Sequence, residues 1–323
     1  MSNLADRELP IVVVTGPTAS GKSGLAMKLA DQFPCRLISV DSSMVYQGMD
    51  IGTAKPDETL LSQYPHDLVD IRAPHQTYSV GDFVVDATHA IAEARGAGRI
   101  PLLVGGTLLY LRGLFQGLAE LPPADAELRE QIALEAGEVG WGQLHQKLAK
   151  IDPEAAAAIG LNDQQRIQRA LEVYQITGKP ISYWQNQPRS TAVRARVLKI
   201  ILSPPQRETL HQQIAQRSQQ MVDAGLIEEV VELRNLLDRS TVQEIDQLPA
   251  MRAVGYRQVL DYLRGDIASD DLLQRITIAT RQLAKRQLTW LRSDPAGIWL
   301  DPNSKKSLKR ACSLVDEHLD CYG

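Results

Sequence analysis

Short, mostly apolar runs, each ending near a threonine, a carboxylate or a glycine turn, recur along much of the chain. Runs of this kind are typical of strands that are buried on both faces of a parallel sheet. The predicted strands are, in chain order, Ile11–Thr15, Cys35–Asp41, His66–Ile71, Arg99–Thr107, Arg196–Leu202 and Gly297–Asp301.

Between these strands, apolar residues recur at the three- and four-residue spacing of helices. Leu25 and Leu29 lie four apart after the first strand, and Ile167, Leu171 and Tyr174 share one face of a later segment. The predicted helices begin near Ser23 and then span residues 79–95, 108–114, 164–177, 207–238, 272–292 and 305–319.

A proline-containing break at residues 121–124 ends the first alternation of strands and helices. Beyond it, every predicted element is helical until the strand at 196–202 returns. We therefore predict that residues 1–122 form the first part of an α/β core, and residues 123–190 a helical insertion domain. Residues 191–323 complete the core and carry its basic C-terminal helices.

The first strand runs into Gly16-Pro-Thr-Ala-Ser-Gly-Lys-Ser23, which has the G-x-x-x-x-G-K-S spacing of a phosphate-binding P-loop. Its glycines let backbone N–H groups approach phosphate oxygens, and the following helix N-terminus adds partial positive charge. Lys22 is expected to reach the terminal phosphate, and the Ser23 hydroxyl to hold Mg²⁺, which prefers oxygen ligands. The expected diphosphate cradle consists of Gly16, Pro17, Thr18, Ala19, Ser20, Gly21, Lys22 and Ser23.

A glycine turn without a ligand is the alternative, but the strand before the motif and the helix after it favour a phosphate site. The fold expected from these patterns is α/β and P-loop NTPase-like. It has three layers around a central, mostly parallel sheet, with an all-helical insertion domain added.

Three further residues are candidates for chemistry at this site. Asp41 closes the second predicted strand, and ligands of open α/β sheets bind outside the carboxyl ends of strands. Thr107 ends another strand at the same edge, where it can face the pocket, cap the next helix, or do both. Arg217 can clamp a phosphate or be an ordinary surface arginine, and the pattern does not separate these two roles.

The chain of 323 residues is 44% hydrophobic and 23% charged, which is ordinary for a globular protein. Met1–Asp6 lacks the features of a signal peptide, and the most apolar window, 100–111, is shorter than the about 20 residues of a membrane span. Three scattered cysteines without a C-x-x-C pair favour a reducing cytosol and argue against structural zinc. We expect a cytoplasmic monomer that contacts no membrane.

The net charge is −4, but the charges are unevenly distributed. Residues 164–207 include eight bases and one acid, and residues 272–292 include five bases and no acid. In the second segment, Arg281, Lys285 and Arg292 form a stripe opposite the apolar face of the predicted helix. Such a stripe suits a phosphodiester backbone, with a solvated helix face as the alternative.

Two classes of function fit these features. One is an enzyme that transfers a group between a phosphorylated donor and a polynucleotide, and the other is a nucleotide-gated module that binds nucleic acid. The carboxylate at the end of a strand favours the enzyme. A P-loop small-molecule kinase is a third possibility, although it would not need the basic helix at 272–292.

Further blocks of the sequence resemble the tRNA dimethylallyltransferases, also called tRNA isopentenyltransferases, of the bacterial type. Ser23 stands where that family commonly has threonine, and this keeps the hydroxyl. The resembling blocks are residues 16–23, 41–44, 48–56, 104–107, 109–110, 162–169, 253–257 and 279–292.

The resemblance implies transfer of a dimethylallyl group from dimethylallyl diphosphate to N6 of adenosine 37 in a tRNA anticodon loop, with release of pyrophosphate. It implies Asp41 as the general base and Thr107 as a group that holds donor or base in line. Lys22, Arg217 and Mg²⁺ near Ser23 would stabilise the departing diphosphate. The nearest alternative is the related enzyme that prenylates free AMP-type nucleotides.

The resemblance also implies contacts with the anticodon stem-loop, carried over from the family's regions onto matching positions. These positions are Asp41, Ser42, Ser43, Met44, Thr107, Arg129, Gln165, Arg166, Ile167, Gln168, Arg169, Arg252, Ala253, Val254, Gly255, Tyr256, Arg257, Lys285, Arg286, Gln287, Leu288, Thr289, Trp290, Leu291 and Arg292.

Overall fold

The computed structural model describes residues 10–187, 193–239, 245 and 248–320. Three expectations concern residues outside this part: the N-terminal segment Met1–Asp6, Cys321, and the segment boundary at 190–191. The chain forms two compact units, which are described separately below. Unit 1 comprises Met1–Phe115 and Ala192–Gly323, and unit 2 comprises Gln116–Thr191.

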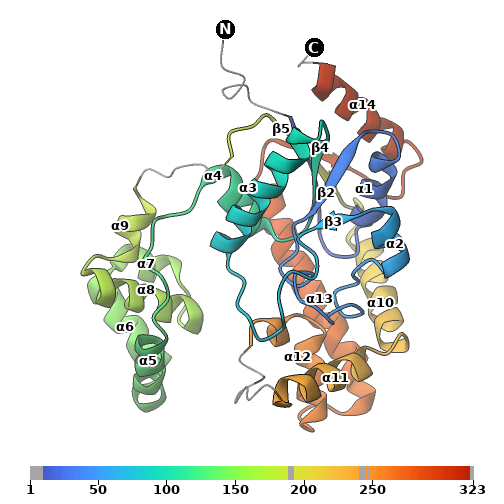
Figure 1. The fold of residues 1–323 in the computed structure, drawn as a ribbon. Coiled ribbons are helices and arrows are strands. Elements are labelled where there is room, and N and C mark those ends of the chain that lie inside the picture. Colours follow the sequence, from blue (N-terminus) through green and yellow to red (C-terminus); the bar gives the residue numbers. More distant parts are fainter. Residues whose placement is uncertain (1–9, 188–192, 240–244, 246–247, 321–323) are drawn as a thin grey trace. The chain divides into compact units, whose positions relative to one another are not determined.

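Unit 1 is built on a single sheet in which every pair of neighbouring strands is parallel (Figure 1). The strand order is β3-β2-β4-β1-β5-β6, so the P-loop strand β1 lies inside the sheet. The strands are β1 (Ile11–Thr15), β2 (Cys35–Ser39), β3 (His66–Asp67), β4 (Ile100–Gly105), β5 (Val197–Leu202) and β6 (Gly297–Leu300).

All six predicted strands are present, but β3 is shorter than the predicted strand His66–Ile71. Leu68 and Asp70 have φ angles of 64° and 56°, which take the backbone out of the extended conformation after Asp67. The third strand therefore ends after two residues, at the edge of the sheet.

The helices of unit 1 largely follow the predicted ranges. The predicted helix 207–238 is instead two helices, because the chain turns at Gly225, where φ is +100°. The helices are α1 (Lys22–Ala30), α2 (Glu58–Gln63), α3 (Val80–Gly96), α4 (Leu108–Gln116), α10 (Arg207–Asp223), α11 (Leu226–Arg239), α12 (Tyr256–Leu263), α13 (Ser269–Arg292) and α14 (Ser307–Asp320).

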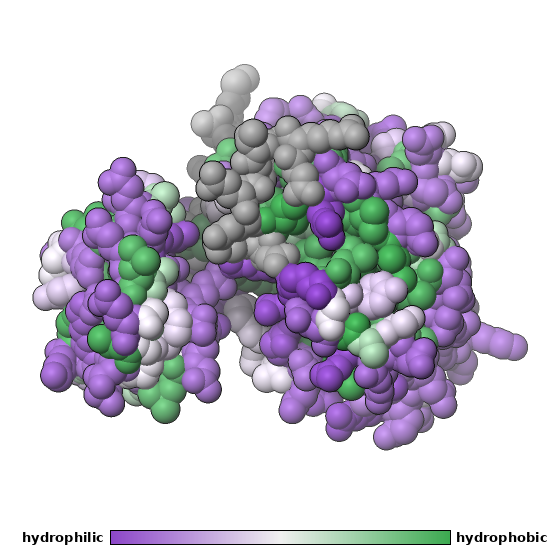
Figure 2. Space-filling model, turned by 90° about the horizontal axis from the view of Figure 1, so that it is seen from below, coloured by the Kyte–Doolittle hydropathy of each residue, from purple (hydrophilic) through white to green (hydrophobic). Residues whose placement is uncertain are grey.

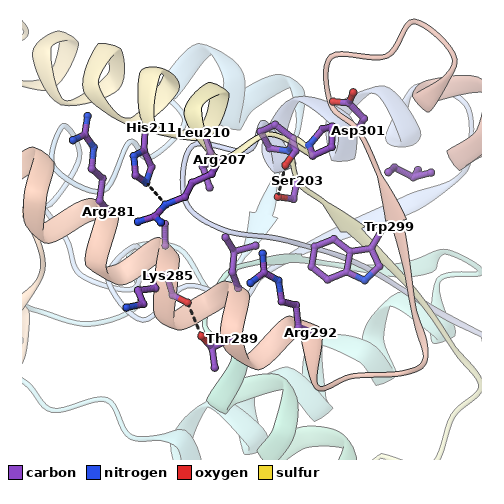
Figure 3. Close-up of a pocket in the computed structure, with 15 residues that line it drawn as sticks. Ser203, Arg207, Leu210, His211, Arg281, Lys285, Thr289, Arg292, Trp299 and Asp301 are labelled. Carbon is purple, nitrogen blue, oxygen red and sulfur yellow. Dashed lines mark hydrogen bonds between the residues drawn. The ribbon is translucent and has the colours of Figure 1, made fainter.

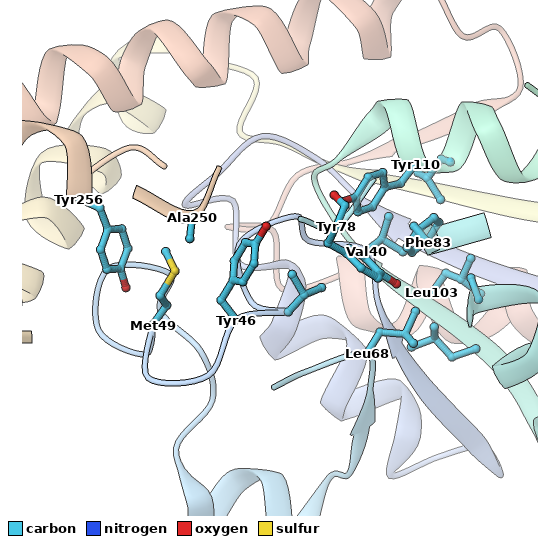
Figure 4. Close-up of a cluster of buried hydrophobic side chains, with 14 of the residues drawn as sticks. Val40, Tyr46, Met49, Leu68, Tyr78, Phe83, Leu103, Tyr110, Ala250 and Tyr256 are labelled. Carbon is cyan, nitrogen blue, oxygen red and sulfur yellow. The ribbon is translucent and has the colours of Figure 1, made fainter. Parts of the chain in front are cut away.

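Both faces of the sheet are covered, which confirms the three-layer α/β fold. Ile11 and Val13 of β1 face a core shared with α3, α4, α11, α12 and α13, part of which is drawn in Figure 4. Val12 and Val14 face the opposite core, shared with α1 and α14. Because β1 is buried on both sides, its sequence is a continuous apolar run.

Unit 2 is entirely helical in its described residues, and its core is formed by Ile132, Leu144, Leu148 and Ile167. It begins at Gln116, ahead of the predicted segment 123–190. The carbonyl of Pro122 accepts a hydrogen bond from Arg169, which ties this part of the connection to unit 2. Its helices are α5 (Ala126–Val139), α6 (Trp141–Ile151), α7 (Pro153–Ala158), α8 (Gln164–Thr177) and α9 (Ile181–Gln185).

In the described part of the chain, no helix combines the length and the apolar character needed to cross a membrane. Seen from the α11–α12 end, unit 1 shows a largely hydrophilic surface with hydrophobic residues gathered in one stretch (Figure 2). Cys35 and Cys312 are free thiols, and burial raises the pKa of Cys35 to about 12, so its thiol is protonated at neutral pH.

Candidate active site

The P-loop turn connects β1 to α1 in a conformation that only glycine fits at its first position. Gly16 has a φ of +154°, and a Cβ atom there would lie 2.1 Å from the carbonyl oxygen of Leu202. Gly21, with φ +80°, immediately precedes α1, whose first residue is Lys22. The turn therefore leads backbone N–H groups to the N-terminus of a helix, where anions bind favourably.

This turn lines a cavity of about 290 Å³ at the carboxyl ends of β1, β2 and β4. Separate parts of the sequence meet in it, among them the P-loop, the loop after β2, the turn after β4, and the helices α10 and α13. The lining residues include Thr18, Ala19, Ser20, Gly21, Lys22, Ser23, Ser39, Asp41, Met44, Thr53, Ala54, His66, Gly105, Gly106, Arg217 and Gln287.

Lys22 has a strongly lowered pKa in this cavity. Its Nζ donates a 2.7 Å hydrogen bond to the carbonyl of Pro17. Burial lowers the pKa of Lys22 to about 7, with Arg217 acting in the same direction and Asp41 in the opposite one. A bound anion would therefore favour the charged form of the Lys22 amine and raise its pKa.

Asp41 follows β2 and is half-buried in the cavity wall. Its Oδ1 accepts hydrogen bonds from the backbone N–H groups of Ser43 at 2.9 Å and Met44 at 3.3 Å. Within the described residues, no hydrogen bond reaches Oδ2. One carboxylate oxygen thus orients the side chain, and the other can accept a proton or a hydrogen bond from a ligand.

Thr107 lies directly after the lining pair Gly105 and Gly106, and its hydroxyl is bound to the loop after β2. Its Oγ1 accepts a 3.0 Å hydrogen bond from the backbone N–H of Ser42 and donates to Ser42 Oγ at 3.4 Å. The observed role of this side chain is therefore to hold the residue next to Asp41.

Arg217 of α10 lines the cavity and donates a 3.2 Å hydrogen bond to the carbonyl of Thr53. Burial lowers the pKa of Arg217, and the nearby Asp41 acts in the opposite direction. Of the two roles that the sequence left open, the position of Arg217 in the cavity wall supports the phosphate clamp.

Two hydroxyl groups in the cavity wall are buried without a partner. Within the described residues, Ser20 Oγ and Ser39 Oγ make no hydrogen bond, although both atoms are buried. Unsatisfied buried polar groups are costly, and a bound ligand is one way to satisfy them. Together with the P-loop N–H groups, they suit a ligand rich in oxygen atoms.

The candidate ligands of the expected magnesium ion are the side chains that line this cavity. Among the described residues, no group of three or more His, Cys, Asp or Glu side chains could hold a metal. Ser23 presents a hydroxyl to the cavity, and Mg²⁺ commonly combines few protein oxygens with phosphate oxygens and water. The donor set is therefore compatible with Mg²⁺ held mainly by a bound diphosphate.

Gln287 on α13 closes the cavity from the helical layer. Its Oε1 accepts a 2.8 Å hydrogen bond from the backbone N–H of Thr18, and its Nε2 donates a 3.0 Å bond to the carbonyl of Gly106. A Cβ atom at Gly106 would lie 2.5 Å from Gln287 Nε2, so a side chain there would displace this amide from its hydrogen bonds. This side chain therefore bridges the P-loop and the glycine turn after β4.

A second cavity, of about 620 Å³, lies between α10, α13 and β6 (Figure 3). Arg207, Arg281, Lys285 and Arg292 line it, and none of the four forms an ion pair with another described residue. Trp299 adds an indole ring to the wall, 42% exposed. We call this cavity the basic groove. Asp301 also lines it, but the four basic side chains outnumber this one acid, and the excess of positive charge suits a polyanion.

The residues of 285–292 are divided between the two sides of α13. Lys285, Arg286, Thr289, Trp290 and Arg292 are exposed, whereas Leu291 is buried. Gln287 is committed to the P-loop, and Leu288 packs against Leu210, Ile214 and Ala284. The exposed members are the ones whose side chains can reach a ligand at the surface.

The segment 252–257 is divided in the same way. Arg252 and Arg257 are exposed, Ala253 and Val254 are half-buried, and Gly255 and Tyr256 are buried. Only the two arginines present charged side chains at the surface.

In unit 2, the predicted contact residues surround a buried carboxylate. Arg129 donates to both carboxylate oxygens of Glu172, at 2.9 and 3.1 Å, and Arg169 donates to Oε2 at 2.7 Å. Gln168 donates to the carbonyl of Arg129. These side chains therefore connect α5 to α8.

The remaining three residues of 165–169 in α8 differ in exposure. Gln165 and Arg166 are exposed, and Ile167 is fully buried. Only the first two have side chains at the surface of unit 2, and Arg166 forms an ion pair there with Asp163 at 3.5 Å.

Ser39 and Thr53 line the active-site cavity but were not predicted as site residues. Ser39 precedes Asp41 by two residues, and strand side chains two apart point to the same side, so this spacing could have indicated it. Thr53 lies in an irregular loop, for which the sequence offers no such rule.

The fold and this cavity define a class: an α/β protein of the P-loop type, with a cavity at the carboxyl edge of its sheet. The model of the IPP transferase family matches residues 44–294. The chain belongs to this family, as do proteins named tRNA dimethylallyltransferase. One of these, tRNA dimethylallyltransferase 2 of Hahella chejuensis, is 48% identical over 323 residues, covering 96% of each chain.

Two solved structures are also similar. A full-length tRNA isopentenylpyrophosphate transferase from Bacillus halodurans has a TM-score of 0.69, 35% identity and 97% coverage of both chains. A eukaryotic dimethylallyltransferase described as acting on tRNA has a TM-score of 0.80 and 25% identity, covering 97% of this chain and 80% of its own. The resemblance found in the sequence is thereby confirmed.

Proposed function

We propose that the chain transfers a dimethylallyl group from dimethylallyl diphosphate to N6 of adenosine 37 in the anticodon loop of tRNA, within adenosines 36 to 38, and releases pyrophosphate. The observation that carries this proposal is that the P-loop, Arg217 and Asp41 line one cavity. The names of the relatives support the same reaction, since they are tRNA dimethylallyltransferases.

The first requirement of this reaction is to stabilise the charge that develops on the departing diphosphate. The P-loop N–H groups, the Lys22 ammonium and the Arg217 guanidinium converge on the cavity where that charge would form. Mg²⁺, held near Ser23 by diphosphate oxygens, would supply additional positive charge when bound. The P-loop would thus serve the departure of pyrophosphate rather than phosphoryl transfer.

The second requirement is a base for the adenine amine, which is a weak nucleophile because its lone pair is delocalised. As the N6–carbon bond forms and the carbon–oxygen bond of the donor breaks, the amine becomes acidic. Asp41 would accept the N6 proton on its free Oδ2, while Oδ1 stays bound to the loop N–H groups. The allylic carbon becomes cation-like, so the half-enclosed cavity must also exclude water.

The third requirement is to bring the target adenine of the tRNA into the cavity. An anticodon loop is already single-stranded, which reduces the cost of a few kcal/mol for unstacking the target adenine. Four exposed basic side chains of unit 1 would contact the RNA backbone: Arg252, Arg257, Lys285 and Arg292. Gln165 and Arg166 would do so from unit 2.

The deciding experiment offers radiolabelled dimethylallyl diphosphate to an anticodon stem-loop and to AMP in parallel. We expect label on the stem-loop, and none after its target adenosine is replaced by a guanosine. Label on AMP alone would instead identify a free-nucleotide prenyltransferase. Transfer of the γ-phosphoryl group of ATP to a small-molecule acceptor, with ADP as the leaving group, would identify a kinase.

A further inference from the structure

A loop between β2 and α2 has both of its ends in the candidate active site. We call residues 41–56 the pocket loop. Asp41 and Met44 line the cavity from its first end, and Thr53 and Ala54 line it from its second end. The position of the middle of this loop therefore affects both the proposed base and the wall around Arg217.

One carboxylate binds the middle of the pocket loop. Glu229 Oε2 accepts hydrogen bonds from the backbone N–H groups of Asp50 at 3.0 Å and Ile51 at 2.7 Å. Its Oε1 accepts a third bond from Gly52 at 3.2 Å. Hydrogen bonds to an ionised group are about twice as strong as neutral ones, so three of them on one side chain fix this backbone firmly.

Tyr256 completes the attachment. Its hydroxyl donates a 2.5 Å hydrogen bond to Glu229 Oε1, and its ring is fully buried (Figure 4). A Cβ atom at Gly52 would lie 2.4 Å from that ring, so loop and ring are in close contact. Burial and the neighbouring Glu229 both raise the pKa of Tyr256, which keeps the phenol protonated as a donor.

The attachment continues from the loop into the cavity. Thr53 follows the three residues bound by Glu229, and its hydroxyl donates to the carbonyl of Met49 at 2.7 Å. The carbonyl of Thr53 in turn accepts the bond from Arg217 at 3.2 Å. A continuous set of contacts therefore runs from Tyr256, beside the exposed Arg257, to the guanidinium in the cavity wall.

We propose that Glu229 and Tyr256 are positioning residues, which hold the pocket loop so that Arg217 faces the bound donor and Asp41 faces the adenine amine. Tyr256 belongs to the segment 252–257, so it also links the exposed Arg252 and Arg257 to the pocket loop. This inference rests on the proposed function, because it assigns the pair a role in dimethylallyl transfer through Arg217.

The test compares Glu229→Gln and Tyr256→Phe with Glu228→Gln, which changes an exposed carboxylate on the same helix and serves as the matched control. Single-turnover transfer to an anticodon stem-loop is measured at saturating donor and RNA. We expect the two variants to react about 10- to 100-fold more slowly, since displacements near 1 Å can cost that much. RNA affinity should stay within about twofold of the wild type, and Glu228→Gln should match the wild type.

A double-mutant cycle with Arg217→Lys separates positioning from general loss of structure. If Glu229 acts through Arg217, the combined rate loss is smaller than the product of the single losses. The inference would be overturned if the rate loss of the double variant equalled the product of the two single losses. It would also be overturned if Glu229→Gln and Tyr256→Phe reacted as fast as the wild type. Tyr256→Phe removes a single hydroxyl and gives the same answer if Glu229→Gln does not fold.

The active fraction of each variant, titrated with the donor, corrects these rates for misfolded protein. A rate loss that disappears after this correction would also overturn the inference. Absence of transfer by the wild type and by Glu228→Gln would instead refute the proposed function itself, so the two failures are distinguishable.

Discussion

Asp41 and Lys22 each have an environment that fits a distinct task in one cavity. Two backbone N–H groups fix one oxygen of Asp41 and leave the other available. Lys22 is buried and lies near Arg217, and these two effects lower its pKa to about 7. The loop after β2 therefore fixes Asp41, the proposed base. The protonation of Lys22, in contrast, depends on whether an anion occupies the cavity.

Replacement of Asp41 by asparagine should slow the chemical step by roughly 10²- to 10⁴-fold. The amide keeps an oxygen that can accept the bonds from Ser43 and Met44, so the loop is preserved while the basic oxygen is lost. Single-turnover transfer measures the rate, and filter binding should show nearly unchanged RNA affinity. Asp270→Asn, an exposed site on α13, is the control, and equal activity of Asp41→Asn would remove Asp41 as the base.

The pKa of Lys22 predicts proton uptake when a diphosphate binds. Above pH 7 the free amine is mostly neutral, and the bound anion raises its pKa, so binding takes up a proton and weakens as pH rises. Calorimetry at pH 8, in buffers of different ionisation enthalpy, should detect up to one proton. Lys22→Arg stays charged and should take up none, whereas identical uptake by both proteins would contradict the assignment to Lys22.

At the scale of single elements, α13 presents two different faces to two cavities. Gln287 faces the P-loop, and Arg281, Lys285 and Arg292 face the basic groove. The period of the helix separates these faces, so one element can serve the donor site and a polyanion at the same time. The basic stripe was predicted from this period, but the bridging role of Gln287 was not.

Lys285→Ala combined with Arg292→Ala should weaken binding of the anticodon stem-loop and reduce its dependence on salt. Each lost phosphate contact lowers the slope of log affinity against log salt by about 0.7 to 0.9. Fluorescence anisotropy at several salt concentrations measures this slope. Lys306→Ala with Lys309→Ala removes two exposed charges near α14 as a control, and an unchanged slope would make the stripe an ordinary solvated face.

At the scale of the whole molecule, each unit has its own hydrophobic core. Unit 1 is organised around the sheet and unit 2 around Ile132, Leu144, Leu148 and Ile167. Two carboxylates are buried in the described part of unit 2, Asp152 and Glu172, and Glu172 binds two arginines. Changes there should therefore affect unit 2 and leave the P-loop cavity intact.

Glu172→Gln should destabilise unit 2 by about 2 kcal/mol, because hydrogen bonds to a buried charged group are weakened while the two arginines, which are partly exposed, stay hydrated. Burial raises the pKa of Glu172, but hydrogen bonds from Arg129 and Arg169 outweigh it, and the pKa lies below its ordinary 4.5. The stabilisation is thus complete above about that pH and is lost as the pH falls through the lowered value. Hydrogen exchange should show faster exchange in α5 and α8 only, and equal protection would contradict this role.

Local patterns were sufficient for the strands, the P-loop and Asp41, because each depends on neighbours in the sequence. The bonds of Gln287 and Glu229 were not predicted, since Gln287 and Thr18 lie 269 positions apart and Glu229 binds backbone groups in an irregular loop. Tyr256 shows the same limit, because its position in a recognisable block does not reveal that it is fully buried. Contacts made only in the folded chain leave no periodic signal.

The place of β1 between β4 and β5 has a consequence for synthesis on the ribosome. β1 pairs with β5 through residues such as Ile11 and Val197, and all of unit 2 is translated between β4 and β5. The edge of β1 that pairs with β5 therefore stays unpaired in the nascent chain until the last residues of β5 have left the exit tunnel. A nascent chain stalled before that point would expose this edge to aggregation or to chaperones.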